Sequence, residues 1–234
     1  METVTEKSDN RRYTPLSRRI TDRDFILLRW IGEQYSIDLE HLRILVGMNT
    51  NRKTKRANKV TKVAVHKLVQ RWQELGLVSY QKFEYGADKP GWVWLTNTGL
   101  QLVGLDYRYN EPNFTLLEHR RQINQVRLWF EKQAIEEDQE LEWTSEREWL
   151  YMLGGKVGHI PDAVIVWKGK KLALEIELSR KRTERIKEII TGILAIEKID
   201  GGVYFVNSAT ENLIKEAIKG YKSISYRRLE GVEV

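Results

Sequence analysis

The chain has 234 residues, of which 41% are hydrophobic and 31% charged, with no cysteine and four histidines. These proportions are typical of a globular protein with enough apolar residues to build cores, and no apolar run approaches the length of a membrane span. The missing cysteines exclude disulfides and thiolate zinc sites, which fits the cytoplasmic location that we expect. A chain of this length favours two domains.

The net charge of +6 is concentrated at one end of the chain. Residues 1–112 hold 19 Lys and Arg against 13 Asp and Glu, whereas residues 113–234 hold 20 of each. Attraction to a polyanion is therefore expected of the N-terminal part, although an excess of this size is also common in ordinary bacterial proteins. Residues 1–19 are polar and basic, with no apolar stretch that indicates a secretory signal, and we expect them to form a flexible basic arm.

Three helices are predicted in the first part of the chain. The first begins at the cap Thr21 and runs to Tyr35, with an apolar stripe at helical spacing. The second covers 38–46 and is expected to end at Gly47. The third covers roughly 56–75; one side is apolar and the other carries mostly basic and polar side chains.

A β-hairpin is predicted directly after the third helix. Residues 77–85 alternate like a strand, residues 86–90 form a turn, and residues 91–96 form a second strand, in which Trp92 and Trp94 are expected to be core aromatics. Three helices followed by a hairpin predict a winged helix over residues 20–105. In that arrangement the third helix enters the major groove of DNA.

A run of basic residues precedes this third helix, and between Asn49 and Lys62 it contains no acid. Cations at the start of a recognition helix can neutralise phosphates, while polar side chains on its exposed face can read base edges. The alternative is a solvated, charged loop. The position before a helix favours duplex DNA as the partner, and a homodimer is left open. The residues expected to contact DNA are Arg52, Lys53, Lys55, Arg56, Lys59, Lys62, His66 and Gln70.

A second domain is expected over residues 113–234, after an aperiodic segment at 106–113 that contains a proline. A long helix is predicted over 114–137, and three strands over 141–149, 160–167 and 171–178. A helix over 183–199, a strand over 203–206, a helix over 209–221 and a last strand over 223–229 complete the series. This order predicts a mixed sheet flanked by helices in three layers.

Three carboxylates stand out in this part. Period-2 alternation in the strand at 171–178 places Glu175 and Glu177 together on the face opposite its leucines, and Asp162 reaches the same spot if the two strands form a hairpin through 167–170. Neighbouring acids repel each other, and a hard divalent metal with oxygen ligands would offset this. We therefore expect Asp162, Glu175 and Glu177 to be metal ligands and catalytic residues with Mg²⁺ or Mn²⁺. His159 is close enough in sequence for an accessory role, whereas His41 and His119 are expected to be packing or surface residues.

Pro161-Asp162 followed by Glu175-x-Glu177 in this element order resembles the PD-(D/E)XK nuclease superfamily, and residues 172–181 behind a winged helix are similar to plasmid and phage replication-relaxation proteins. The resemblance implies an α+β protein of a mobile genetic element, with a winged helix-turn-helix domain and a PD-(D/E)XK-like α/β domain. It also implies that Asp162 and Glu175 bind metal. The sequence departs from the pattern because Glu177 stands where the superfamily usually has lysine. Arg180 or Lys181 could supply a displaced cation, and Glu118 could join the acids.

Three functions follow from these features. The first is a metal-dependent DNA endonuclease. The second is a non-catalytic DNA-binding protein of plasmid replication, mobilisation or transcription, with the nuclease-like fold kept as a scaffold; the missing lysine favours this one, and the retained acids favour the first. The third is a structural adaptor that binds other proteins.

Overall fold

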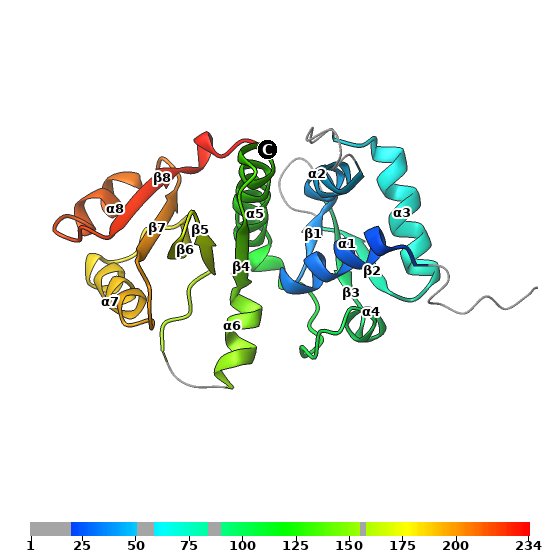
Figure 1. The fold of residues 1–234 in the computed structure, drawn as a ribbon, viewed down its shortest axis with the longest axis horizontal. Helices are drawn as coiled ribbons and strands as arrows, with labels where there is room; N and C mark the ends of the chain where they lie inside the picture. Colours follow the sequence, from blue (N-terminus) through cyan, green and yellow to red (C-terminus); the bar gives the residue numbers. More distant parts are fainter. Residues whose placement is uncertain (1–19, 51–58, 84–89, 155–157) are drawn as a thin grey trace, which may run out of the picture.

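The structure is a computed structural model that describes residues 20–50, 59–83, 90–154 and 158–234. The predicted basic arm at 1–19 and most of the predicted turn at 86–90 lie outside these ranges. The chain is a mixed α+β protein with a three-stranded sheet in its N-terminal half (residues 20–105) and a five-stranded sheet in its C-terminal half (residues 106–234) (Figure 1).

The N-terminal half consists of helices around a small antiparallel sheet with strand order β1-β3-β2. Its elements are α1 (Asp22–Glu33), β1 (Ile37–Asp38), α2 (Leu39–Thr50), α3 (Lys62–Glu74), β2 (Val78–Lys82), β3 (Gly91–Leu95) and α4 (Asn97–Leu102). The predicted cap of the first helix is confirmed, because Thr21 and Asp24 form a reciprocal capping box. The hairpin is confirmed as well, with Val78 opposite Leu95 and Lys82 opposite Gly91.

The N-terminal half differs from the sequence prediction at five points. The first helix ends at Glu33 rather than at Tyr35. The second helix does not end at Gly47 but runs through this buried residue to Thr50, because packing outweighs the weak helix preference of glycine. The third helix begins later than expected, at Lys62, and the exposed Thr61 is its N-cap. The short strand β1, paired with β3, and the helix α4, capped by Thr96, were not predicted.

The C-terminal half places a five-stranded mixed sheet, with strand order β4-β5-β6-β7-β8, between two layers of helices. Strands β4, β5 and β6 are antiparallel, and β6, β7 and β8 are parallel. The elements are α5 (Leu117–Glu137), β4 (Leu141–Ser145), α6 (Glu146–Leu153), β5 (Ala163–Trp167), β6 (Lys170–Glu177), α7 (Thr183–Leu194), β7 (Gly201–Val206), α8 (Glu211–Ala217) and β8 (Ile224–Arg228).

Each face of this sheet has its own apolar core. On one face, Ile123 and Phe130 of α5 pack against Leu174 and Ile176 of β6. On the other face, isoleucines of α7 and α8 pack against β6, β7 and β8. The predicted three layers are therefore confirmed. The predicted strand at 141–149 is wrong in its second part, because Ser145 caps α6 by accepting the backbone N–H of Glu148 at 3.2 Å.

Helix α5 lies between the two sheets and contacts both halves of the chain (Figure 1). Leu128, on the side turned away from the five-stranded sheet, is fully buried in the core of the N-terminal half. Asn124 donates to the carbonyl oxygen of Ser36 at 2.9 Å, and Arg127 pairs with Glu33 at 2.8 Å. Buried side chains therefore hold the two halves together.

Arg147 of α6 adds a second connection between the halves. It is 7% exposed and donates to the carbonyl oxygens of Gly32 and Arg108, both at 2.7 Å. Its guanidinium also lies 4.7 Å from the ring centre of Tyr35 and 5.0 Å from that of Tyr107, distances at which cations attract aromatic rings. The guanidinium of Arg147 thus donates hydrogen bonds to backbone groups that lie outside α6.

Candidate functional site

The first candidate site is the exposed face of α3. Val65, Leu68 and Trp72 are turned into the core of the N-terminal half, and this fixes which side of the helix faces solvent. The side chains on the solvent side are Lys62, Val63, Ala64, His66, Lys67, Gln70, Gln73 and Glu74. Over its first two turns this face has basic and polar groups but no carboxylate, since Glu74 lies at the far end and accepts from Gln70 at 3.2 Å.

Four of the residues expected to contact DNA lie in the described ranges, and α3 brings three of them together. Lys62, His66 and Gln70 recur every four residues along its exposed face. Lys59 lies just before the helix and pairs with Glu40 of α2 at 2.7 Å. The other four, Arg52, Lys53, Lys55 and Arg56, lie outside the described residues.

Glu40 partly balances the cations at the start of α3. Its carboxylate contacts Arg43 at 2.8 Å and Lys59 at 2.7 Å, and Lys62 at 3.8 Å. Partial burial would raise the pKa of Glu40, but hydrogen bonds from Lys59 and Arg43 hold it below its ordinary value. Glu40 therefore stays ionised. Lys67, on the next turn of α3 after Lys62, has no ion pair in the part of the chain that the structure describes.

The second candidate site is the β5–β6 hairpin, which brings Asp162 beside Glu175. Trp167 pairs with Lys170 across a two-residue turn, and Lys168 and Gly169 both have positive φ, as the tight primed hairpin turns require. In this register Ala163 lies opposite Leu174, so Asp162 lies next to Glu175. An oxygen of Asp162 accepts the backbone N–H of Ile176 at 2.7 Å. The predicted hairpin is confirmed.

Two histidines contact these carboxylates. His159 Nε2 lies 2.5 Å from Glu175 Oε1, and His119 Nε2 of α5 lies 3.3 Å from Asp162 Oδ2 and 3.1 Å from the carbonyl oxygen of Ile176. Burial would lower the pKa of His119, but its hydrogen bond to Asp162 and the charge of that carboxylate raise it above the ordinary value. Asp162 therefore favours the protonated form of His119.

Glu175 lies almost completely inside the protein. It is 7% exposed, and burial raises its pKa to about 7; the neighbouring charge of Asp162 adds to this, and the hydrogen bond to His159 opposes it. Tyr204 of β7, paired in register with Glu175, is fully buried, and its hydroxyl has no hydrogen-bond partner among the described residues. Burial and the charges of nearby carboxylates raise the pKa of this phenol as well.

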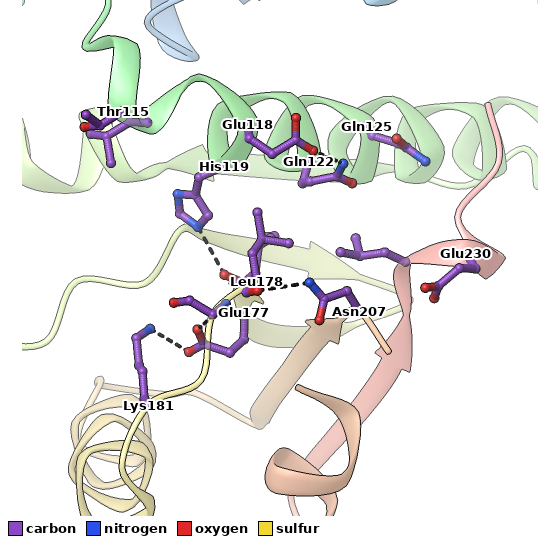
Figure 2. A pocket seen from close by; sticks show the side chains of 14 residues that line it. Thr115, Glu118, His119, Gln122, Gln125, Glu177, Leu178, Lys181, Asn207 and Glu230 are labelled. Atoms are coloured by element: carbon purple, nitrogen blue, oxygen red, sulfur yellow. Dashed lines mark hydrogen bonds and ion pairs between the residues drawn. The ribbon is translucent and has the colours of Figure 1, made fainter. Parts of the chain in front are cut away.

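Glu177 has a cation of its own. The carboxylate is 3% exposed, and Lys181, four residues later, places Nζ 2.5 Å from Oε2 (Figure 2). This lysine lies in the loop that connects β6 to α7. Lys181, one of the two residues expected to supply a displaced cation, therefore lies next to Glu177. Arg180 instead donates to the carbonyl oxygen of Ala209 at 3.2 Å.

A polar cavity of about 770 Å³ opens between α5, the end of β6 and the C-terminal segment (Figure 2). His119, Gln122 and Gln125 line it from α5, and Glu177 and Lys181 line it from the opposite side. Glu118 also borders the cavity, but its carboxylate accepts from Gln122 at 2.8 Å on the same helix and does not join the other acids. The cavity gives solvent access to His119 and to the Glu177–Lys181 pair.

The carboxylates do not form a metal-binding set as they are placed here. Within the described ranges, no group of three or more Asp, Glu and His is arranged to hold a metal ion. Asp162 accepts from a backbone N–H, Glu175 contacts His159, and Glu177 contacts Lys181. Each of the three carboxylates thus already contacts a donor of the protein, and among the described residues the expected set of Mg²⁺ or Mn²⁺ ligands is not assembled.

The sequence did not indicate the role of His119. His159 stands three residues before Asp162, and this short spacing was the signal that suggested an accessory position. His119 lies 43 positions before Asp162 on a different element, and only the packing of α5 against the sheet brings the two together. Sequence spacing alone carries no signal for such a contact.

Comparison with known proteins adds no relative. No family model, no curated protein and no solved structure matches this chain. In the described parts of the chain, no helix combines the length and the apolar character needed to cross a membrane. The function is therefore inferred from the residues and their arrangement.

Proposed function

We propose that this protein binds duplex DNA through α3 and the basic residues around the start of that helix. It acts as a DNA-binding protein of a plasmid or phage, and its C-terminal half has a nuclease-like fold. The similarity of residues 172–181 to replication-relaxation proteins supports the link to a mobile element. The observation that carries the proposal is the cationic and polar face of α3, which is exposed over the whole helix.

The arrangement of the N-terminal half supports a winged helix. Helix α3 follows α2 along the chain and packs against it, and the β2–β3 hairpin follows α3 directly, with β1 completing the sheet. In winged-helix proteins such a third helix reads the major groove. Lys62 and Lys67 would then contact phosphates, and His66 and Gln70 would face base edges.

The test is fluorescence anisotropy of the full chain with labelled duplex DNA over a range of salt concentrations. The double variant Lys62→Ala/Lys67→Ala should bind all sequences more weakly, with the slope of log K against log salt smaller by about two, because two phosphate contacts are lost. The matched control is Lys219→Ala/Lys222→Ala in the C-terminal half, which removes the same charge elsewhere. Wild-type protein that shows no salt-sensitive DNA binding would refute the proposal.

A second candidate function is DNA cleavage at the β5–β6 hairpin. It is supported by the juxtaposition of Asp162 with Glu175 and by the Glu177–Lys181 pair beside an open cavity. In PD-(D/E)XK nucleases the matching hairpin carries the acids. Here the carboxylates contact His and Lys side chains, so we keep cleavage as the second candidate and DNA binding as the first.

Incubating the full chain with supercoiled, linear and branched DNA, with Mg²⁺, with Mn²⁺ and with chelator, tests this candidate. Cleavage that is lost in both Asp162→Asn and Glu175→Gln, while DNA binding is retained, would support it. The control variant is Glu142→Gln, an exposed carboxylate of β4. DNA that stays intact under every condition would leave a DNA-binding protein whose C-terminal half is a scaffold.

A further inference from the structure

A cavity of about 400 Å³ lies between α2, the first turns of α3, the β2–β3 hairpin and α5. This volume falls within the range of about 300–1,000 Å³ that is typical of pockets for small ligands. The cavity is separate from the carboxylate hairpin and shares no lining residue with the larger cavity in Figure 2. Its polar lining residues are Asp38, Glu40, Arg43, Lys62, His66, Tyr80, Lys82 and Arg121.

The cavity carries an excess of positive charge. Four of its lining residues are Lys or Arg, and only two are carboxylates. Asp38 is 1% exposed and is held by His41, and Glu40 is paired with Arg43 and Lys59. Burial would raise the pKa of Asp38, but the charge and hydrogen bonds of His41, together with Arg121, hold it below the ordinary value. Both carboxylates are therefore already engaged by the protein.

Two of the cations have no such partner. Arg121 of α5 is half-buried, and Lys82 at the end of β2 is exposed; neither makes a hydrogen bond or ion pair in the part of the chain that the structure describes. A guanidinium has five N–H donors in a planar fork that matches the oxygens of a phosphate or carboxylate. The charge of Arg121 acts on Asp38, but its N–H donors have no hydrogen-bond acceptor among the described residues.

Tyr80 adds a third unused polar group. Its ring lines the cavity beside His66, with ring centres 6.2 Å apart, and its hydroxyl is buried without a hydrogen-bond partner among the described residues. A buried hydroxyl without a partner costs free energy of the order of 1–3 kcal/mol. An acceptor oxygen in the cavity would pair with Arg121 and Lys82, whereas Tyr80 contributes its ring to the wall of the cavity.

We infer that this cavity is a phosphate-binding pocket, in which Arg121 and Lys82 supply the positive charge and the ring of Tyr80 forms part of the wall. The phosphate comes from one of two sources, the backbone of bound DNA or a free nucleotide. Only the first source rests on the proposed DNA binding. Arg121 belongs to α5 in the C-terminal half, so this pocket joins a residue of that half to the surface that carries α3.

The experiment uses the full chain and the variants Arg121→Gln and Lys82→Gln. Arg185→Gln is the control, because Arg185 is an exposed arginine on α7, far from the cavity in sequence and paired with Glu188. Anisotropy measures affinity for duplex DNA over a range of salt concentrations. Calorimetric titration with inorganic phosphate and with ATP, without divalent metal, measures binding of free phosphate groups.

A backbone phosphate predicts that Arg121→Gln weakens binding to every duplex and lowers the slope of log K against log salt by about one, while the control is unchanged. A free nucleotide predicts that ATP binds to the wild type and that this binding is lost in Arg121→Gln, with DNA affinity unchanged. Unchanged DNA affinity together with no binding of phosphate or ATP to the wild type would overturn the inference. If the wild type binds no DNA, the proposed function fails, but the ATP titration still decides on the pocket.

Discussion

At the scale of single residues, the acids of the β5–β6 hairpin are the most unusual feature of this protein. Glu175 is buried beside a second carboxylate and a histidine, and its pKa is raised to about 7 from an ordinary value of 4.5. A carboxyl group that gains protons on folding stabilises the fold fully below the ordinary pKa, and this contribution is lost as the pH rises through the folded value. The ionisation of Glu175 should therefore lower the free energy of unfolding as the pH rises from 4.5 to 7.

Glu175→Gln should remove this pH dependence, because the amide cannot ionise. Relative to wild type, the variant should gain stability as the pH rises from 5 to 8, by up to about 3 kcal/mol for a pKa shift of this size. Urea unfolding at both pH values, with chelator present, measures the difference. The control variant Glu142→Gln, at an exposed position, should show no such trend. If Glu175→Gln and wild type differ in stability by the same amount at pH 5 and pH 8, burial does not raise the pKa of Glu175.

The hydroxyl of Tyr204 gives a second prediction at this scale. It is fully buried and unpaired within the described structure, so its removal costs no hydrogen bond. Tyr204→Phe should leave the protein equally stable or stabilise it by about 1 kcal/mol. Thermal unfolding of both proteins provides the measurement. A loss of about 1 kcal/mol or more would show that an ordered water or another group occupies the space beside this hydroxyl.

At the scale of single elements, α3 separates general from specific DNA contacts. His66 and Gln70 lie one turn apart on its exposed face, on either side of Lys67. The double variant His66→Ala/Gln70→Ala should change which sequences are preferred, with a cost of about 1–3 kcal/mol for each lost base contact. In vitro selection from a random duplex library, run in parallel on Lys67→Ala, is the measurement. An unchanged preferred site in the double variant would assign base reading to another element.

The sequence predicted elements well where the signal is local. Alternation and the Lys168-Gly169 turn were enough for the β5–β6 hairpin, and the Thr21–Asp24 box was enough for the start of α1. The helix α6 was missed because Trp149 continues the period-2 spacing of Leu141 and Trp143, although Ser145 caps a helix between them. His119 contacts Asp162, and Arg121 lines the cavity, only because of the way α5 packs against other elements. The spacing of residues in the sequence does not predict this packing.

At the scale of the whole molecule, polar and aromatic side chains join the two halves through α5 and α6. Arg127 is 7% exposed, pairs with Glu33 and Glu131, and lies 4.7 Å from the ring centre of Trp30. Trp30 in turn donates to Glu131 at 2.7 Å. Because these contacts are buried and cross between the halves, the two parts should unfold together.

Arg127→Ala should therefore destabilise the whole chain rather than one half. Loss of a buried ion-pair partner costs about 3–5 kcal/mol, because Glu33 and Glu131 lose this cation and, within the described residues, keep only Arg29 and the indole N–H of Trp30 as partners. Circular dichroism and tryptophan fluorescence should report one shared transition in wild type and variant. The control Arg185→Ala removes an exposed pair and should change stability by less than about 1 kcal/mol. Two separate transitions in the wild type would show that the halves are energetically independent.

The position of α5 also bears on how such a gene can be rearranged. A recombination event that exchanged residues 20–105 for another DNA-binding unit would leave Asn124, Arg127 and Leu128 facing a surface for which they have no complementary groups. The new unit would have to bring its own version of this helix or acquire matching changes on it. The N-terminal half that carries α3 and the C-terminal half that carries the β5–β6 hairpin would thus be inherited together. Relatives with a foreign N-terminal half should differ first at these three positions of α5.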